Sequence, residues 1–388
     1  MSGMRVVHLS KVTGVAGSEN HLLTLLPGLR SRGVDVRLCL LVEPGRPVQE
    51  MVAQTTAMGV PTTRLTIRHD ADITLLWRLA RLLRQEQPDI LHTHLIHADL
   101  YGTLAAHMAR VPYVVSSRHN DDRFRYRLPV RWLTRTLWRY TDAGIAISHA
   151  IREFSIRVEG APAERVHTIH YGLDPTRLPA LPAARAALRA DLGLPDETVL
   201  IGSICRLVEQ KGLSYALRGF AAIAADFPKA HYVIAGDGPL RQALQREAET
   251  LGLAERVHFL GWRSDAYAVF AGLDIFLAPS LWEGFGLVLL EAMAYRLPII
   301  STTVSAIPEI VLDGQTGWLV PPRDAPALAT ALRAALADEA ERQRRGALGR
   351  QRLETDFTAA AMVERTLSLY ERLCHSPSSS PPEASDHE

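Results

Sequence analysis

The sequence predicts an α/β protein of two doubly wound parallel-sheet lobes that face each other across a cleft. A chain of 388 residues is longer than one hydrophobic core usually serves. Short apolar runs alternate with longer amphipathic stretches, which indicates parallel strands covered by helices on both faces. The Pro- and Ala-rich stretch 174–197 has no strand pattern and divides these runs into two series.

We expect the apolar runs to form strands and the stretches between them to form helices. The stretches 21–29 and 213–225 show the helical spacing of apolar residues most clearly. In the first lobe the expected strands are 4–9, 35–42, 89–93, 112–116 and 143–147. In the second lobe they are 198–204, 231–235, 257–260, 274–278 and 298–301.

The boundary between the lobes is expected in 174–197, as a linker with one short helix. This places a first domain at 1–178 and a second at 195–357. The end of the chain, 375–388, consists mainly of Ser, Pro and acidic residues, so we expect a disordered tail.

Net charge, cysteine spacing and the length of apolar runs indicate which classes of protein are disfavoured. The formal net charge is only +1, so no overall field favours nucleic acid as a partner. The spacing of Cys39, Cys205 and Cys374 gives no disulfide or metal framework, and Cys39 and Cys205 lie in runs that predict buried strands. There is neither a secretory signal pattern nor an apolar run near the roughly 20 residues that span a bilayer. We expect a cytoplasmic protein, soluble or attached peripherally at the inner face of the cell membrane.

The stretch 279–291, PSLWEGFGLVLLE, predicts an anion site. It leaves a strand, turns through two glycines and enters a helix, whose first N–H groups and positive dipole end suit a diphosphate. Glu283 precedes the turn, and Glu291 lies five residues after Gly286, about 7.5 Å along the helix axis. Carboxylates there suit sugar and ribose hydroxyls. The alternative is that Glu283 caps the helix and Glu291 is a surface residue.

Residues that follow two other expected strands, 198–204 and 231–235, would complete this anion site. Arg206 and Lys211 follow the strand 198–204, where two cations would stabilise a departing diphosphate. The alternative is a pair of solvated loop charges. The AGDGP turn at 235–239 would line a nucleotide pocket or be a plain turn.

These motifs, in this order, resemble the retaining GT-B transferases of glycosyltransferase family 4. The resemblance rests on the Glu–seven residues–Glu motif in EGFGLVLLE, on Arg206 with Lys211-Gly212, and on PEIVLDGQTGWLVPP at 308–322. An aromatic residue before a long closing helix, 357–373, also fits, and the likeness covers about 5–374. One departure is Cys205, where many relatives have Gly.

The resemblance implies a fold and an activity. The fold is GT-B, with a closing helix at about 358–374 that returns to the first lobe. The activity is retaining transfer of a hexose-type sugar from a UDP- or GDP-sugar to a hydroxyl acceptor, such as a sugar or a lipid-linked acceptor, without metal or cofactor. The expected role is synthesis of cell-surface polysaccharide, lipopolysaccharide or glycolipid. Alternatives are another GT-B enzyme, such as a phosphorylase or epimerase, and an inactive nucleotide- or sugar-binding protein.

The resemblance also assigns residues in the donor site. Glu291 would hold the ribose and Glu283 the hydroxyls of the donor sugar, while Arg206 and Lys211 would neutralise the diphosphate. The other donor-binding positions are Gly17, Gly284, Phe285, Gly286 and Leu287.

In the first lobe, the loop 13–20 resembles the family's Gly-Gly-x-Glu loop through Gly17 and Glu19, with Ala16 in place of the first glycine. From the residues alone it is a helix start with Ser18 as a possible cap. His119 follows the strand 112–116, and the resemblance makes it the catalytic histidine that contacts the donor sugar.

Several other histidines lie near a strand end in the first lobe. His92, His94 and His97 raise the alternative of a metal site, which we disfavour because Asp99 is the only acidic residue at ligand spacing. We expect Glu19 and His94 to lie on the acceptor side of the site, with His94 contacting a sugar or the acceptor.

The acidic residues of the sequence also favour a mechanism without a metal ion. Asp70 and Asp72 form an Asp-x-Asp that opens a helix, so helix capping is favoured over metal binding. No carboxylate is an evident covalent nucleophile. Front-side displacement that persists in EDTA is therefore the expected mechanism.

The stretch 123–140, RFRYRLPVRWLTRTLWRY, contains six Arg and no acidic residue. Arg127, Arg131, Arg135 and Arg139 recur every four residues, with Trp132 and Trp138 nearby. On a helix this stripe is typical of an interfacial helix on an anionic membrane surface. The alternative is a solvated helix face.

Overall fold

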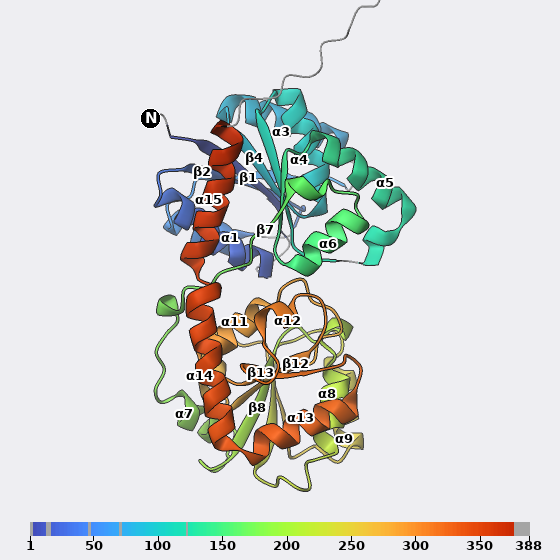
Figure 1. Cartoon of the computed structure of the whole chain (residues 1–388), viewed down its shortest axis with the longest axis vertical. Coiled ribbons are helices and arrows are strands. Elements are labelled where there is room, and N and C mark those ends of the chain that lie inside the picture. Colours follow the sequence, from blue (N-terminus) through green and yellow to red (C-terminus); the bar gives the residue numbers. More distant parts are fainter. Residues whose placement is uncertain (1–2, 13–16, 46–47, 70–71, 122, 376–388) are drawn as a thin grey trace, which may run out of the picture.

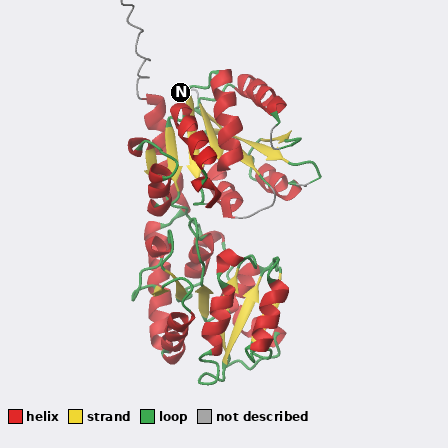
Figure 2. Ribbon diagram, turned by 90° about the vertical axis from the view of Figure 1, so that its right-hand side faces the viewer, coloured by secondary structure: helices red, strands yellow, loops and turns green. Residues whose placement is uncertain are grey.

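The computed structural model describes residues 3–12, 17–45, 48–69, 72–121 and 123–375. Two α/β lobes lie one above the other in Figure 1, and Figure 2 shows helices on both faces of their sheets. Apart from His375, the tail expected to be disordered lies outside these residues. No helix among the described residues is both long and apolar enough to cross a membrane.

The first lobe has a seven-stranded sheet in the order β3-β2-β1-β4-β5-β6-β7, with every neighbouring pair parallel. Its strands are β1 Arg5–Lys11, β2 Asp35–Val42, β3 Thr62–Thr66, β4 Ile90–His94, β5 Tyr113–Arg118, β6 Ala143–Ala146 and β7 Val166–Thr168. Its helices are α1 Gly17–Arg30, α2 Gln49–Ala57, α3 Ile73–Glu86, α4 Leu95–Ala109, α5 Leu128–Leu137 and α6 His149–Arg157, with short 3₁₀ turns η1 Arg123–Tyr126, η2 Trp138–Tyr140 and η3 Ala163–Arg165.

The second lobe has a six-stranded parallel sheet in the order β10-β9-β8-β11-β12-β13. Its strands are β8 Val199–Ile204, β9 Ala230–Ala235, β10 Val257–Gly261, β11 Ile275–Ala278, β12 Ile299–Thr302 and β13 Gly317–Val320. Its helices are α8 Leu213–Ala221, α9 Arg241–Thr250, α10 Ala266–Gly272, α11 Leu287–Ala294, α12 Ile307–Ile310, α13 Ala325–Ala337 and α14 Glu339–Asp356.

Two chain segments join the lobes. The linker contains the one short helix that was expected, α7 Ala184–Asp191. After α14, the chain returns to the first lobe as α15, Ala359–His375, which packs on α1 (Figure 1). The two crossings touch at Leu173 and Thr358, which form an isolated parallel bridge.

The expected apolar patterns account for the cores. The leucines at 22, 25, 26 and 29 on α1 are all buried. All ten expected strands are present. Strands β3, β7 and β13 were not expected: β3 is mostly polar and exposed, β7 has only three residues, and β13 lies within the 308–322 motif, where no strand was assigned.

Four details differ from expectation. Cys205 lies just after β8, not within it, and the helix from 213 ends at Ala221. Asp72 precedes α3 but makes no capping bond to the helix, because its carboxylate accepts from Thr74, Arg78 and the Arg68 N–H. The expected helix over 123–140 is broken into η1, α5 and η2.

Candidate active site

The glycine turn of the second lobe lies against the first lobe. Gly286 has φ +92° and directly precedes α11, so a side chain at this position would strain the turn. Gly284 faces the main chain of the other lobe, where a Cβ at 284 would lie 2.2 Å from the His119 carbonyl oxygen. Phe285, between the glycines, is buried. The close approach of the two backbones therefore requires glycine at 284.

Lys211 and Glu283 meet at the carboxyl ends of β8 and β11. The Lys211 Nζ lies 2.5 Å from Glu283 Oε2, and both side chains are largely buried. The two loops are tied by a bond from the Leu281 N–H to the Gln210 carbonyl, and Gly212 packs on the Pro279 carbonyl. The ion pair thus places one cation and one carboxylate beside the glycine turn.

Arg206 lies in the loop between β8 and α8 that also carries Lys211, and Glu291 lies on α11, which follows the glycine turn. The Arg206 side chain is exposed and makes no ion pair with a described residue. Glu291 is half-buried on α11, where burial raises the pKa of its carboxyl to about 7 despite a hydrogen bond with Tyr267. Of these four predicted charged residues, the structure brings Lys211 and Glu283 into direct contact.

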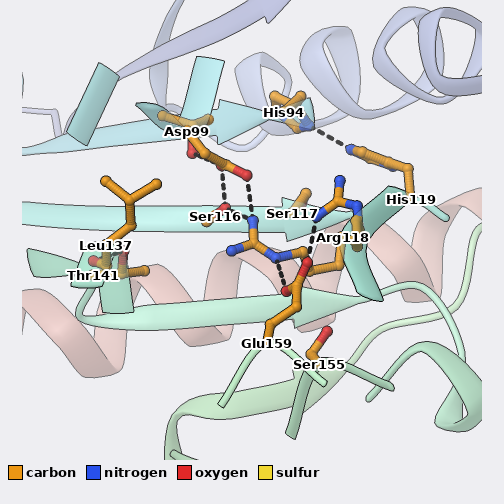
Figure 3. Close-up of polar contacts among 12 residues, drawn as sticks. His94, Asp99, Ser116, Ser117, Arg118, His119, Leu137, Thr141, Ser155 and Glu159 are labelled. Atoms are coloured by element: carbon orange, nitrogen blue, oxygen red, sulfur yellow. Dashed lines mark hydrogen bonds and ion pairs between the residues drawn. The ribbon is translucent and has the colours of Figure 1, made fainter. Parts of the chain in front are cut away.

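His94 and His119 are adjacent in the first lobe, at the ends of β4 and β5 (Figure 3). His94 Nδ1 lies 3.1 Å from His119 Nε2. His119 Nδ1 hydrogen-bonds to the hydroxyl of Tyr171. Both ring nitrogens of His119 thus have partners within the first lobe, and a bond from this ring to a donor sugar requires one partner to be exchanged.

The start of α1 lies close to these histidines. Glu19 is buried, and the His21 ring stacks on Tyr171 with a centroid separation of 4.3 Å. Gly17 is the first residue of α1, whereas 13–16 of the predicted glycine loop lie outside the described residues. The sequence did not single out His21 or Tyr171, because neither belongs to a local motif.

A buried ion network lies behind His119. Arg118 donates to Glu159 at 2.7 Å and to Asp99, and Arg125 donates to the other oxygen of Glu159 (Figure 3). All four side chains are buried. Because Arg118 directly precedes His119, the network fixes the end of β5 that carries the histidine.

The histidine group differs from the one suggested by the sequence. His92 and His94 meet His8 of β1, and these three offer ligand atoms close enough together for a metal ion. His97 instead lies 3.5 Å from the Nζ of Lys11. Asp99 binds Arg118 and hydroxyl groups, so it is no partner of the histidines.

Glu309, within the 308–322 motif, joins the lobes. Its carboxylate on α12 accepts from the N–H groups of His149 and Ala150 at the start of α6, at 2.8 and 2.9 Å. It also pairs with His170 at 2.8 Å. The motif itself could have pointed to this residue, but the residues it meets lie far away in sequence.

Comparisons with known proteins identify the family. The model for glycosyl transferases group 1 matches residues 184–352, and the model for Glycosyltransferase Family 4 matches residues 15–177. An alpha-D-kanosaminyltransferase from Streptomyces kanamyceticus is 31% identical over 288 residues, which span 70% of this chain and 74% of that protein. The chain belongs to the family 4 glycosyltransferases.

This glycosyltransferase has other relatives in sequence and structure. The UDP-Gal:alpha-D-GlcNAc-diphosphoundecaprenol alpha-1,3-galactosyltransferase of Escherichia coli is 27% identical, over 85% of this chain and 87% of that protein. HepE of Anabaena, solved with UDP and glucose, has a TM-score of 0.84 at 20% identity, covering 95% of this chain and 99% of that one. WaaG, a glycosyltransferase involved in lipopolysaccharide biosynthesis, has a TM-score of 0.71 at 17% identity, covering 95% and 99%. These likenesses confirm the predicted GT-B fold.

Proposed function

We propose that this glycosyltransferase moves a hexose-type sugar from a UDP- or GDP-sugar to a hydroxyl acceptor, with retention of anomeric configuration and without a metal. The product would be a cell-surface polysaccharide or glycolipid. The observation that carries the proposal is the Lys211–Glu283 pair beside the Gly284–Gly286 turn. Support for a nucleotide-sugar donor comes from HepE, solved with UDP and glucose, and from the UDP-Gal-dependent relative.

The charges of the site suit a departing diphosphate. The bond that breaks leaves negative charge on the diphosphate, which the start of α11, Lys211 and Arg206 would stabilise in the transition state. Cations held by the chain take the place that a metal ion has in other transferases. Glu291 would accept from the ribose hydroxyls, one and a half helical turns beyond Gly286.

Retention is proposed to proceed by front-side displacement. Glu283 is the carboxylate at the glycine turn, and its pairing with Lys211 makes it a weak nucleophile. In the proposed step, the acceptor oxygen bonds to the anomeric carbon on the face from which the diphosphate leaves. The departing phosphate oxygen takes the acceptor proton. Glu283 then serves to hold sugar hydroxyls, not to form a covalent intermediate.

Nucleotide binding tests the donor site. Titration calorimetry with UDP, GDP and ADP in EDTA should show tight binding of one nucleotide. Lys211→Ala and Glu291→Ala should each weaken it by about tenfold or more, because each removes a charged hydrogen-bonding partner. Incubation with the matching sugar donors, followed by NMR of the product's anomeric proton, would then show whether configuration is retained. Absence of binding to all three nucleotides, or an inverted product, would contradict the proposal.

We also propose that the first lobe attaches peripherally to an anionic membrane surface through 123–140. The part of the prediction that placed Trp138 beside the basic stripe is wrong, since Trp138 is buried and packs on Gly144. The large exposed hydrophobic side chains described in this segment are Phe124, Tyr126, Leu128, Trp132 and Tyr140, with exposed fractions of 38, 57, 75, 71 and 43%. Arg127, Arg135 and Arg139 are exposed in the same segment. Apolar and basic groups together suit an interfacial site.

Liposome sedimentation tests this attachment. The wild-type protein should sediment with anionic vesicles at low salt and be released as salt rises. A double variant, Leu128→Ser and Trp132→Ser, should remain in the supernatant. The matched control is Trp262→Ser, because Trp262 is 75% exposed but lies in the second lobe. Equal sedimentation of all three proteins would overturn the proposal.

A further inference from the structure

A chain of hydrogen-bonded rings runs through the first lobe to the junction with the second. His8 Nδ1 lies 3.0 Å from His94 Nε2, and His94 Nδ1 lies 3.1 Å from His119 Nε2. His119 Nδ1 then meets the hydroxyl of Tyr171. All four side chains are buried. The rings come from β1, from the ends of β4 and β5, and from the segment after β7, which leads out of the lobe.

The three imidazoles are neutral at physiological pH. Burial is the largest cause, and it lowers the pKa of His8 to about 3 and those of His94 and His119 well below their ordinary value. A neutral imidazole has one N–H donor and one acceptor nitrogen. Because His94 uses both nitrogens with other imidazoles and His119 uses both with His94 and Tyr171, the bonds must all run in one direction.

Only two arrangements satisfy every bond. If the Tyr171 hydroxyl donates to His119 Nδ1, then His119, His94 and His8 all carry their proton on Nε2. If His119 Nδ1 donates to the hydroxyl instead, all three carry it on Nδ1. Phenol is the more acidic donor, so the first arrangement is favoured. Beyond His8 the chain continues to the Tyr370 hydroxyl, which lies 3.5 Å from His8 Nε2. A hydroxyl thus stands at each end of the three rings, and the Tyr171 hydroxyl is the one bonded to His119.

Tyr171 is also in contact with both lobes. Its ring packs edge-on against Phe285 of the donor turn, with centroids 5.2 Å apart, and stacks on His21. Gly172 follows it directly, and a Cβ at 172 would lie 2.3 Å from the Thr358 carbonyl at the second crossing. The position of the Tyr171 hydroxyl thus depends on how the lobes are joined.

We propose that Tyr171 is a positioning residue, whose hydroxyl fixes the tautomer and orientation of His119 and ties both to the junction between the lobes. The effect on catalysis rests on the proposed function, in which His119 acts on the donor sugar. The tautomer of His119 and its hydrogen bond with Tyr171 do not depend on the proposed function.

Tyr171→Phe tests the proposal because it removes the hydroxyl and keeps the ring that packs on Phe285. The ring nitrogens of His119 are observed by ¹⁵N NMR and assigned by their loss in His119→Gln. In the wild type, Nε2 should be protonated and Nδ1 should show a hydrogen-bonded lone pair. In Tyr171→Phe, the Nδ1 resonance should move toward that of a free lone pair. The kcat should fall about tenfold, with the donor KM within twofold.

The matched control is Tyr232→Phe. Tyr232 is another buried tyrosine, whose hydroxyl lies 2.7 Å from Ser203 Oγ in the second lobe. This variant should leave the His119 resonances and kcat unchanged, and thermal melting checks that both variants are folded.

Two results would overturn the proposal. One is an unchanged His119 Nδ1 resonance in folded Tyr171→Phe. The other is a changed resonance with wild-type kcat. If His119→Gln itself kept full activity, the role of His119 in the proposed function would be wrong, while the NMR comparison would still decide what Tyr171 does to the ring.

Discussion

At the scale of single residues, the two glutamates of one motif lie in different environments. Glu283 is held by Lys211 at 2.5 Å. Glu291, eight residues later, has Tyr267 as its partner, and burial raises the pKa of its carboxyl to about 7. Glu283 is thus held in an ion pair, whereas Glu291 gains its charge within the neutral range. The motif thus contains one ion-paired carboxylate and one whose charge changes near neutral pH.

Donor binding should therefore strengthen as pH rises through 7. The charged form of Glu291 accepts from ribose hydroxyls better than the protonated form does, and its population grows about tenfold between pH 6 and pH 8. Calorimetry with the intact nucleotide sugar should show up to about a tenfold gain in affinity. The intact donor is needed because a terminal phosphate titrates near pH 6. Glu291→Gln should bind more weakly and with little dependence on pH; an equal slope in both proteins would contradict this assignment.

The raised pKa of Glu291 also affects the stability of the folded protein. This stability should fall as pH rises, whereas the affinity for the donor should increase. The folded state holds the Glu291 proton up to about pH 7, whereas the ordinary pKa is 4.5. The contribution of Glu291 to the free energy of unfolding is therefore greatest below pH 4.5 and falls as pH rises to about 7. Glu291→Gln should gain stability relative to the wild type at pH 8, by up to about 3 kcal/mol, and gain none at pH 4.5. Thermal melting at the two pH values measures the difference.

The sequence could predict the donor-site residues but not the ring chain. Glu283, Glu291, Arg206 and Lys211 belong to local motifs at the ends of strands, where topology brings them together. Tyr171 meets His119 although the two residues are 52 positions apart in the sequence. Contacts between residues that are far apart in the sequence depend on the three-dimensional packing of the chain. The spacing of residues within a motif therefore cannot predict them.

At the scale of elements, the start of α6 is capped from both lobes. Ser148 caps it from within the first lobe, by accepting from the Ile151 N–H at 3.1 Å. Glu309 of the second lobe accepts from the next two N–H groups, those of His149 and Ala150. A carboxylate at a helix N-terminus is stabilised by the unpaired N–H groups and by the dipole. Glu309 thus joins the lobes through a bond that a helix normally makes within one domain.

Glu309→Gln should loosen the junction of the lobes. The amide accepts fewer bonds and carries no charge, so the His149 and Ala150 amides should exchange about tenfold faster and small-angle scattering should give a larger radius of gyration. Asp324→Asn is the matched control, because Asp324 caps α13 within the second lobe by accepting from the Ala327 N–H. That variant should leave the radius unchanged. Identical scattering of wild type and Glu309→Gln would count against the interpretation.

Acidification should act on the same contact. Burial raises the pKa of Glu309, but the bonds from His170 and the two N–H groups outweigh it, so the pKa is lowered overall from 4.5. A group with a lowered pKa stabilises above its ordinary pKa and loses that effect as pH falls through the folded value. The lobe contact should therefore hold at neutral pH and weaken below about pH 4.5.

Elements that the sequence did not predict share one property. Strands β3, β7 and β13 occupy three of the four sheet edges; β3 and β7 lack an apolar run, and in β13 the apolar Trp318 and Leu319 are only partly buried. An edge strand is covered less and needs fewer apolar residues, so its pattern is weak. The break of 123–140 has a similar cause, because Arg125 turns inward to Glu159 and Trp138 covers Gly144.

At the scale of the whole molecule, the fold depends on two chain crossings that touch. The first passes from β7 through Gly172 and Leu173, and the second passes from α14 through Thr358 into α15. They are joined by the Leu173–Thr358 bridge and by a contact from the Gly172 N–H to Met362 Sδ at 3.3 Å. Any change in how the lobes are placed must be accommodated at this pair of crossings.

Gly172→Ala should therefore destabilise the molecule as a whole. The added Cβ would lie 2.3 Å from the Thr358 carbonyl oxygen and 2.7 Å from the Ala359 nitrogen, which are backbone atoms and cannot rotate away. Overpacking of this kind costs about 1–3 kcal/mol. We expect a lower melting temperature, together with faster amide exchange at the start of α15.

The control for this prediction is Gly349→Ala on α14. A Cβ there has nothing nearer than a Met293 side-chain carbon at 3.4 Å, and alanine favours a helix over glycine by about 0.5–1 kcal/mol. This variant should melt at the same temperature as the wild type or higher. If Gly172→Ala melted like Gly349→Ala, the crossings would have room to separate without loss of stability. The lobes would then be joined chiefly by Glu309 and the ring contacts of Tyr171.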